Sequence, residues 1–129
     1  NLLKELQEKH GFTYMFIAHD LNIVKYISDR IAVMYLGNLV ELADSDEIYA
    51  HTLHPYSQAL LASVPIPDPD KEAQKEAKVL SGDVPSPINP KPGCPFANRC
   101  VHATEKCRTE TPKLREARPG HFVSCHLDF

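Results

Sequence analysis

The sequence predicts an α/β fold, made of the last units of an α/β domain, a proline-rich connector and a small cysteine-rich irregular unit. Patterns typical of helices and of buried strands alternate over the first fifty residues, as they do in α/β domains. Eight of the eleven prolines fall between Pro65 and Pro95, where proline excludes both a continuing helix and a central strand. All four cysteines lie within residues 94–129. We therefore divide the chain into residues 1–50, 51–93 and 94–129.

The first segment is predicted to begin with a helix and a buried strand. Leucines recur at helical spacing before His10-Gly11, where we expect the helix to end because glycine is common just past a helix C-terminus. The nearly unbroken apolar run over residues 13–18 predicts a strand buried on both faces, as in a parallel sheet. Asp20 is placed to cap a second helix, whose apolar positions continue as far as Ile27.

A hairpin and a short helix are predicted to close this segment. Residues 31–35 and 39–42 have the composition of strands, with a turn at Gly37-Asn38 between them. Asp44, with Glu47 three residues later, is typical of a capping box at the start of a short helix.

The middle segment opens with His54-Pro55-Tyr56, which predicts a helix because proline in the first turn loses no hydrogen bond. We interpret residues 65–93 as an extended connector, in which only Lys71–Leu80 has a helical pattern. For His54 the residues indicate no more than a helix N-terminus, with Tyr56 packed inward.

The bulk composition is that of an ordinary soluble protein. The net charge of −3 gives no footprint of nucleic-acid binding, and no apolar run approaches the roughly 20 residues that a membrane helix needs. The first residue is Asn1, the chain opens inside a helical pattern, and no signal peptide is visible. We therefore expect a fragment of a cytoplasmic protein.

His19 is the first candidate for chemistry. It directly follows the predicted buried strand, at the edge of a parallel sheet where ligands of open α/β sheets bind. A neutral imidazole there can donate one hydrogen bond to a phosphate and accept another. From spacing alone, a solvent-facing histidine beside a capped helix start is the favoured interpretation.

The residues around His19 resemble the switch-histidine segment of ABC ATPases. The resemblance covers Thr13–Leu21, continues through Ser28–Met34, and includes Gly37–Glu41. It implies that this is the C-terminal piece of an ABC-type P-loop ATPase domain, in which His19 contacts the γ-phosphate of ATP across a dimer. The phosphate loop, the signature segment and the strand that ends in Asp-Glu are absent. We therefore expect the 129 residues alone not to hydrolyse ATP.

The following segment resembles the ATP-binding subunits of oligopeptide and dipeptide importers. Leu53–Pro65 resembles their His-Pro-Tyr segment, and Gly82–Pro87 and Gly93–Phe96 continue the match, with a slight departure at Ala97–Arg99. The resemblance implies a motor subunit that binds ATP and Mg²⁺, pairs with a second ATP-binding subunit, and lies on the inner face of the cell membrane against permease subunits. Relatives carry nickel or sugars, so the solute stays open.

The cysteines form the second candidate site. Cys94, Cys100, Cys107 and Cys125 are spaced C-x5-C-x6-C-x17-C, which is neither a common zinc ribbon nor a ferredoxin run. Four thiolates can hold zinc or an iron–sulfur cluster, and nearby Arg99, Lys106 and Arg108 would offset their charge. The alternative is reduced, partly buried thiols or adventitious disulfides. The resemblance favours an iron–sulfur cluster over zinc, because some relatives bind one through these cysteines. We expect His102, His121 and His126 to be surface residues.

A different class of function also fits the sequence. The chain could be a cysteine-stapled metal-binding, iron–sulfur or redox module that acts as an interaction domain and carries a remnant of an α/β fold. A small unit with little apolar core gains stability from such a staple.

Overall fold

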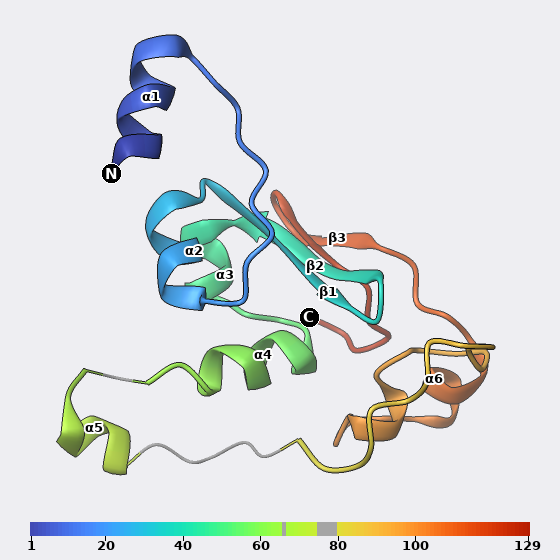
Figure 1. Ribbon diagram of the computed structural model, residues 1–129. Helices are drawn as coiled ribbons and strands as arrows, with labels where there is room; N and C mark the ends of the chain where they lie inside the picture. The colour runs from blue at the N-terminus through green and yellow to red at the C-terminus, as the bar shows by residue number, and fades with distance from the viewer. Residues whose placement is uncertain (66, 75–79) are drawn as a thin grey trace.

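The structure of the protein is a computed structural model that describes residues 1–65, 67–74 and 80–129. Its four strands form one antiparallel sheet in the order β1-β2-β4-β3 (Figure 1). In chain order the elements are α1 (Leu2–His10), α2 (Leu21–Ile27), β1 (Arg30–Tyr35), β2 (Asn38–Asp44), α3 (Ser45–Ala50), α4 (Pro55–Ala62), α5 (Pro69–Ala73), the 3-10 helix η1 (Ala97–Arg99), α6 (Glu105–Thr109), β3 (Arg115–Arg118) and β4 (His121–Val123).

The predicted hairpin is present as β1 and β2. Its turn is made by Leu36 and Gly37, at φ 47° and 78°. Positive φ at both central residues is the geometry of the two-residue turns that best match the twist of paired strands. Asn38 begins β2, and its Nδ2 donates a hydrogen bond to the Leu36 carbonyl oxygen at 3.1 Å. The turn therefore lies one residue earlier than the predicted Gly37-Asn38.

The last strands of the chain extend this hairpin. In the antiparallel pairing of β2 with β4, Glu41 lies opposite Val123 and Leu42 opposite Phe122. Strand β3 then pairs with the other edge of β4. The sequence did not indicate this pairing, because strands this short carry no readable alternation. The boundary proposed between residues 93 and 94 stays a prediction.

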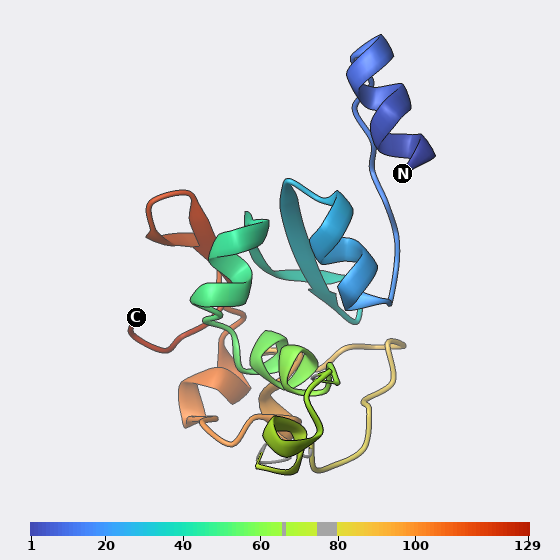
Figure 2. The same cartoon turned by 90° about the vertical axis from the view of Figure 1, so that its left-hand side faces the viewer.

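The apolar run at residues 13–18 is not a strand, which corrects our prediction. It is extended but pairs with no strand in the described part of the chain, and a strand requires a hydrogen-bonded partner. Met15 and Ile17 are 89% and 95% exposed instead of buried. Figure 2 shows this segment leading to α1, which stands apart from the sheet.

Two predicted helix ends are confirmed, whereas the capping box is wrong. Gly11, at φ 69°, ends α1 and donates its N–H to Gln7, and the Asp20 carboxylate accepts from the first turn of α2. The side chain of Asp44 makes no cap hydrogen bond to α3. Glu47 does not turn back to this helix start, because stronger cationic partners lie across the sheet, as described below.

Two apolar clusters hold the elements together. Ile31, Ala43 and Ile48 join the hairpin to α3. Tyr35, Val40 and Phe96 form the second cluster, with Tyr56, Leu80, Cys94 and Cys100 packed around it. Phe96 is only 1% exposed, so the first cysteine segment is fixed directly on the hairpin.

The connector contains α5, which begins within the predicted Pro-rich stretch. The predicted helical pattern at Lys71–Leu80 starts inside α5, but residues 75–79 lie outside the described part of the chain. Among the described residues, no helix is both long enough and apolar enough to cross a membrane.

Candidate functional site

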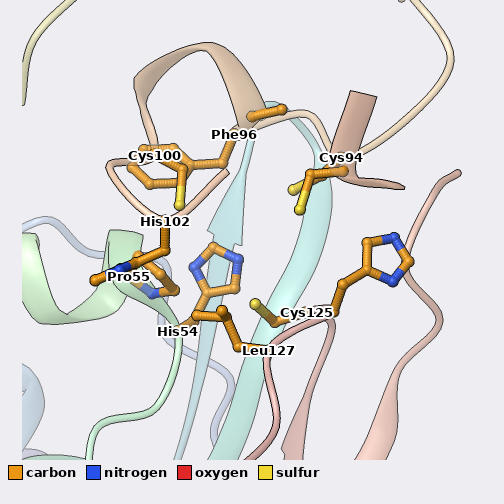
Figure 3. Close-up of a pocket in the computed structure, with 11 residues that line it drawn as sticks. His54, Pro55, Cys94, Phe96, Cys100, His102, Cys125 and Leu127 are labelled. Carbon is orange, nitrogen blue, oxygen red and sulfur yellow. The ribbon is translucent and has the colours of Figure 1, made fainter. Parts of the chain in front are cut away.

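The four cysteines meet at one cavity, although the sequence spreads them over three loops and a helix. Figure 3 shows three of them around the space, with the His54 ring between Cys100 on one side and Cys94 and Cys125 on the other. The cavity lies where the end of β4 and the start of α4 approach the cysteine loops. Its wall consists of His54, Pro55, Cys94, Phe96, Ala97, Cys100, His102, Cys107, Cys125, His126 and Leu127.

Backbone contacts bring the first and third cysteines together. The N–H of Cys94 donates to the carbonyl oxygen of Cys107 at 2.7 Å. Gly93, at φ 102°, permits this approach, because a Cβ at this position would lie 2.5 Å from the same oxygen and 2.6 Å from the Arg108 carbonyl carbon. Only glycine fits here without displacement of the backbone. Cys107 itself is buried in α6, and its Sγ lies 3.4 Å from Thr104 Oγ1.

Backbone N–H groups face three of the sulfurs. The amide two residues later lowers the thiol pKa of Cys94, Cys100 and Cys125 through a hydrogen bond; the donors are Phe96, His102 and Leu127 respectively. Such N–H groups stabilise a thiolate and tune any metal bound to it. The sequence could not predict these N–H groups, because almost every residue type has a backbone N–H.

Burial nevertheless dominates the electrostatics of the thiols. The pKa of Cys94, Cys100 and Cys125 is raised mainly by burial, which disfavours the charged thiolate, and the neighbouring thiols raise this pKa further. The opposing contributions come from backbone amides, not from the predicted Arg99, Lys106 and Arg108. All four cysteines are free thiols.

The described side chains, as they are arranged, do not form a metal site. Within residues 1–65, 67–74 and 80–129, no three His, Cys, Asp or Glu side chains lie close enough together to hold one metal ion. Tetrahedral zinc would require four sulfurs within about 2.3 Å of one point. An iron–sulfur cluster is held by thiolates that bind different irons, so it needs sulfurs around a wider space. The cavity that the four thiols line has a volume of only about 10 Å³, so the side chains as arranged leave no room for a cluster either.

His54 is the histidine most closely integrated into this cavity. It is 1% exposed, and it precedes α4 as the N-cap, where its Nδ1 accepts a hydrogen bond from the Tyr56 N–H at 3.1 Å. The backbone N–H of His54 donates a hydrogen bond to Glu41 Oε2 at 3.1 Å. Burial lowers the pKa of His54 to about 4, so its ring is neutral near pH 7. The predicted helix N-terminus is confirmed, and Tyr56 packs inward against Tyr35 and Phe96.

A buried ionic network lies next to the cavity, and sequence reasoning missed it. Glu41 and His121 are both fully buried, with His121 Nε2 2.6 Å from Glu41 Oε1. The other ring nitrogen of His121 lies 3.2 Å from Glu47, which also pairs with Arg118 at 2.8 Å. The prediction that His121 is a surface residue is therefore wrong. The sequence did contain one indication of this network, because Glu41 is a charged residue inside the otherwise apolar run Leu39–Leu42.

The other candidate residues lie outside this arrangement or at its edge. His102 is exposed, whereas His126 is partly buried and its Nε2 lies 2.8 Å from the Glu110 carbonyl oxygen. His19 is exposed and does not line the cavity. No hydrogen bond or ion pair to His19 is formed within the described residues. Its role as a phosphate-sensing residue stays a prediction.

Comparison with known proteins identifies the chain. Residues 40–107, which include Glu41, the His-Pro-Tyr segment and three of the cysteines, match the family model of the oligopeptide/dipeptide transporter C-terminal region. The chain belongs to this family. The oligopeptide/dipeptide transporter match begins in β2 and ends in α6, so it spans the contact between hairpin and cysteine cavity.

Curated relatives of this transporter family match nearly the whole chain. The sequence is 54% identical over 127 residues to YkfD of Bacillus subtilis, whose name describes an oligopeptide transport ATP-binding protein. It is 50% identical over 127 residues to the oligopeptide transport ATP-binding protein AppF of the same organism. It is 52% identical over 125 residues to OppF of Haemophilus influenzae, which has the same description.

These alignments cover 97–98% of this chain but only 38–39% of the relatives. The chain thus spans about two-fifths of the length of the curated relatives that it matches. Their names give no support to the alternative prediction of a free-standing metal-binding or redox module.

Proposed function

We propose that this chain is part of the ATP-hydrolysing motor subunit of an ABC importer for oligopeptides or dipeptides. The observation that carries the proposal is the identity of 50–54% to peptide-transport ATP-binding proteins over almost every residue of the chain. In this proposal ATP is the substrate and enters with Mg²⁺. The subunit pairs with a second ATP-binding subunit and docks on permease subunits at the inner face of the membrane.

His19 is the residue of this chain assigned to ATP. Its support is the resemblance of the surrounding segment, together with an exposed imidazole next to the capped start of α2. The Asp20 carboxylate accepts a hydrogen bond from the Asn22 backbone N–H at 3.0 Å. This bond fixes the backbone conformation of the residue that directly follows His19. The imidazole would hydrogen-bond the γ-phosphate and stabilise charge as the phosphate leaves.

The test uses the complete subunit. His19→Ala is expected to lower steady-state ATP turnover by roughly 10²–10³-fold while ATP binding is kept, because a hydrogen bond at the γ-phosphate acts on the chemical step. His10→Ala, at an exposed histidine on the end of α1, is the matched control and should leave turnover unchanged. Equal turnover in His19→Ala and the parent would reject the assignment. The 129 residues alone lack a phosphate loop and should show no turnover.

For the cysteines we propose an iron–sulfur cluster held by Cys94, Cys100, Cys107 and Cys125. When bound, it supplies strong thiolate bonds that staple the segment and a centre able to change its charge by one electron. The support is the resemblance to relatives that bind a cluster through these cysteines, together with the one cavity that all four cysteines line. Residues 94–129 would then be a metal-stabilised unit at the end of the Pro-rich connector, with a regulatory or dimer-stabilising role.

Metal analysis decides between the options for this site. The complete subunit, purified without oxygen, is expected to contain iron and sulfide, and Cys→Ser at any of the four positions should release both. Each variant should also be cleaved faster by protease after Pro92, whereas residues 1–64 stay protected. A content of one zinc per chain would show that the site holds zinc and would reject the cluster. A metal-free protein whose four variants resist protease like the parent would reject the site.

A further inference from the structure

The backbone holds Cys94 and Cys107 next to each other. The N–H of Cys94 donates to the carbonyl oxygen of Cys107 at 2.7 Å. Ordinary bond lengths on either side of this hydrogen bond place the two Cα atoms no more than about 6.6 Å apart. A disulfide joins cysteines whose Cα atoms lie roughly 4.4–6.8 Å apart. The backbone of this pair therefore already has a separation that a disulfide can bridge.

The residue before Cys94 shows that this approach is built into the fold. A Cβ at Gly93 would lie 2.5 Å from the Cys107 carbonyl oxygen and 2.6 Å from the Arg108 carbonyl carbon. Glycine is therefore the one residue type that permits the contact without displacement of the backbone. The side chain of Cys107 is held as well, because its Sγ lies 3.4 Å from Thr104 Oγ1.

The two side chains also face the same space. Cys94 and Cys107 both line the cavity of about 10 Å³, and both are free thiols. Formation of a disulfide removes two hydrogens and adds no atom, so it needs no room beyond that of the two side chains. The arrangement that is too tight for a metal cluster is therefore suited to a direct bond between two sulfurs.

The other two cysteines lack this backbone tie to Cys94. Among the residues that the structure describes, no backbone hydrogen bond joins Cys94 to Cys100 or to Cys125. Figure 3 shows Cys125 on the same side of the His54 ring as Cys94, which makes it the competing partner. The direct hydrogen bond between their backbones favours Cys107 over Cys125.

We propose that Cys94 and Cys107 are a thiol–disulfide pair that is oxidised by low-molecular-weight disulfides when no metal is bound. The thiolate of Cys94, the more exposed of the two, attacks one sulfur of the small disulfide and releases one small thiol. The thiolate of Cys107 then attacks the Cys94 sulfur and releases the second. The two cysteines lose two electrons and two protons, which the small disulfide takes up as it becomes two thiols.

The bond would change how the cysteine segment is attached. It closes residues 94–107 into a loop, and this loop contains Phe96, which packs in the apolar cluster with Tyr35 and Val40 of the hairpin. Helix α6 would thereby be tied covalently to the segment that rests on the hairpin. A crosslink of this kind restricts the unfolded chain, so the oxidised segment should resist proteases longer than the reduced one.

The test uses the complete subunit, treated with a chelator without oxygen and then incubated with oxidised glutathione. Remaining thiols are alkylated, and the peptides are mapped by mass spectrometry without reduction. The expected result is one linked peptide that joins Cys94 to Cys107, with loss of both of these thiols to alkylation. Addition of dithiothreitol should restore both thiols.

Single serine variants separate the two steps. Cys107→Ser should accumulate a mixed disulfide of glutathione on Cys94, because the second thiolate is missing. Cys94→Ser should leave Cys107 largely unmodified, since that thiol is buried. Cys100→Ser and Cys125→Ser are the matched controls and should still form the bond between Cys94 and Cys107.

Several results would overturn the proposal. They are a bond from Cys94 to Cys125 or Cys100, a bond between two chains, a stable mixed disulfide in the parent, or four thiols that all remain open to alkylation. Mapping of the parent decides the matter even if a serine variant does not fold. The cluster is judged separately, by the iron content before the chelator is added, so either proposal can fail without the other.

Discussion

The Nε2 atom of His121 lies 2.6 Å from Oε1 of Glu41, and neither side chain is reached by solvent. Both ring nitrogens of this histidine face carboxylates, because Nδ1 lies 3.2 Å from Glu47 Oε1. Arg118 pairs with Glu47 at 2.8 Å, so these four side chains form one network at the junction of β2, α3 and β4. Buried charge of this kind is tolerated because each member is paired and hydrogen-bonded.

Breaking the pair from either side should strongly destabilise the protein. We expect Glu41→Gln and His121→Ala each to lower the free energy of unfolding by roughly 3–5 kcal/mol, because each leaves an uncompensated buried partner. The double variant should lose much less than the sum of the two. Urea denaturation of the parent, the two single variants and the double variant measures these free energies.

Asp44→Asn, which breaks the exposed pair with Arg30 at 3.8 Å, is the control and should cost at most about 1 kcal/mol. Additive losses would contradict the pairing.

Glu47 predicts a specific acid sensitivity. Hydrogen bonds from His121 and His51, and the charge of Arg118, hold the pKa of Glu47 below its ordinary value of 4.5. Because the folded pKa is depressed, the contribution of Glu47 to stability is complete above pH 4.5 and is lost as the pH falls through the folded value.

The measurement is the free energy of unfolding of the parent and of Glu47→Gln between pH 7 and pH 3. The difference between the two proteins should be largest near pH 7 and should shrink below pH 4.5. Asp46→Asn, on the exposed face of the same helix, is the matched control, because Asp46 makes no hydrogen bond or ion pair within the described residues. A difference that does not change with pH would show that Glu47 acts only through packing.

Gly93 and Gly120, both at positive φ, should respond very differently to alanine. Gly93→Ala would place a Cβ within 2.6 Å of backbone atoms of Cys107 and Arg108, whereas Gly120, at φ 69°, has open space around it. Gly120→Ala is expected to cost about 1–2 kcal/mol from the backbone conformation alone. Gly93→Ala should cost at least about 3 kcal/mol, since overpacking adds to the same strain.

Thiol labelling of the metal-free protein tests where the damage from Gly93→Ala falls. Cys94 and Cys107 should become reactive much faster than in Gly120→Ala, because their loops can no longer approach each other. Equal labelling rates in the two variants would mean that the close contact at Gly93 does not hold the cysteines together.

Phe96 is expected to be the most sensitive apolar position of the cysteine segment. It is 1% exposed and packs edge-on against Tyr35, with 5.2 Å between the ring centroids. Phe96→Ala should lower the free energy of unfolding by roughly 3–5 kcal/mol. Phe12→Ala, at a half-exposed ring before the hairpin, should have a small effect. Thermal unfolding of both variants provides the comparison, and similar midpoints would contradict the central role of Phe96.

The parts that could be predicted from sequence are those with a local physical cause. Gly11, Asp20 and Pro55 act on their own helix ends, and the alternating strands around Gly37 specify a hairpin within a few residues. The spacing of the cysteines indicated a shared site, although not its wall. His54 and the amides that face the sulfurs could not be deduced, because they come from segments that approach only in the folded chain.

The errors have equally specific causes. Residues 13–18 have the composition of a buried strand, but composition cannot supply the neighbouring strands that would pair with them. Asp44 and Glu47 have the spacing of a capping box, yet the carboxylate of Glu47 gains more from two histidines and Arg118 than from one backbone N–H. His121 was expected at the surface because a single sequence does not reveal that Glu41, eighty positions earlier, lies beside it.

The Glu41 carboxylate joins segments that would otherwise open separately. One of its oxygens accepts from Leu53 and His121, and the other accepts from His54. The start of α4, the middle of the hairpin and the last strand therefore share a single side chain. Local opening of any one of them must break hydrogen bonds to a charge that stays buried, which raises the free energy of partial unfolding towards that of the whole. We therefore expect the three segments to exchange their amide hydrogens as one cooperative unit.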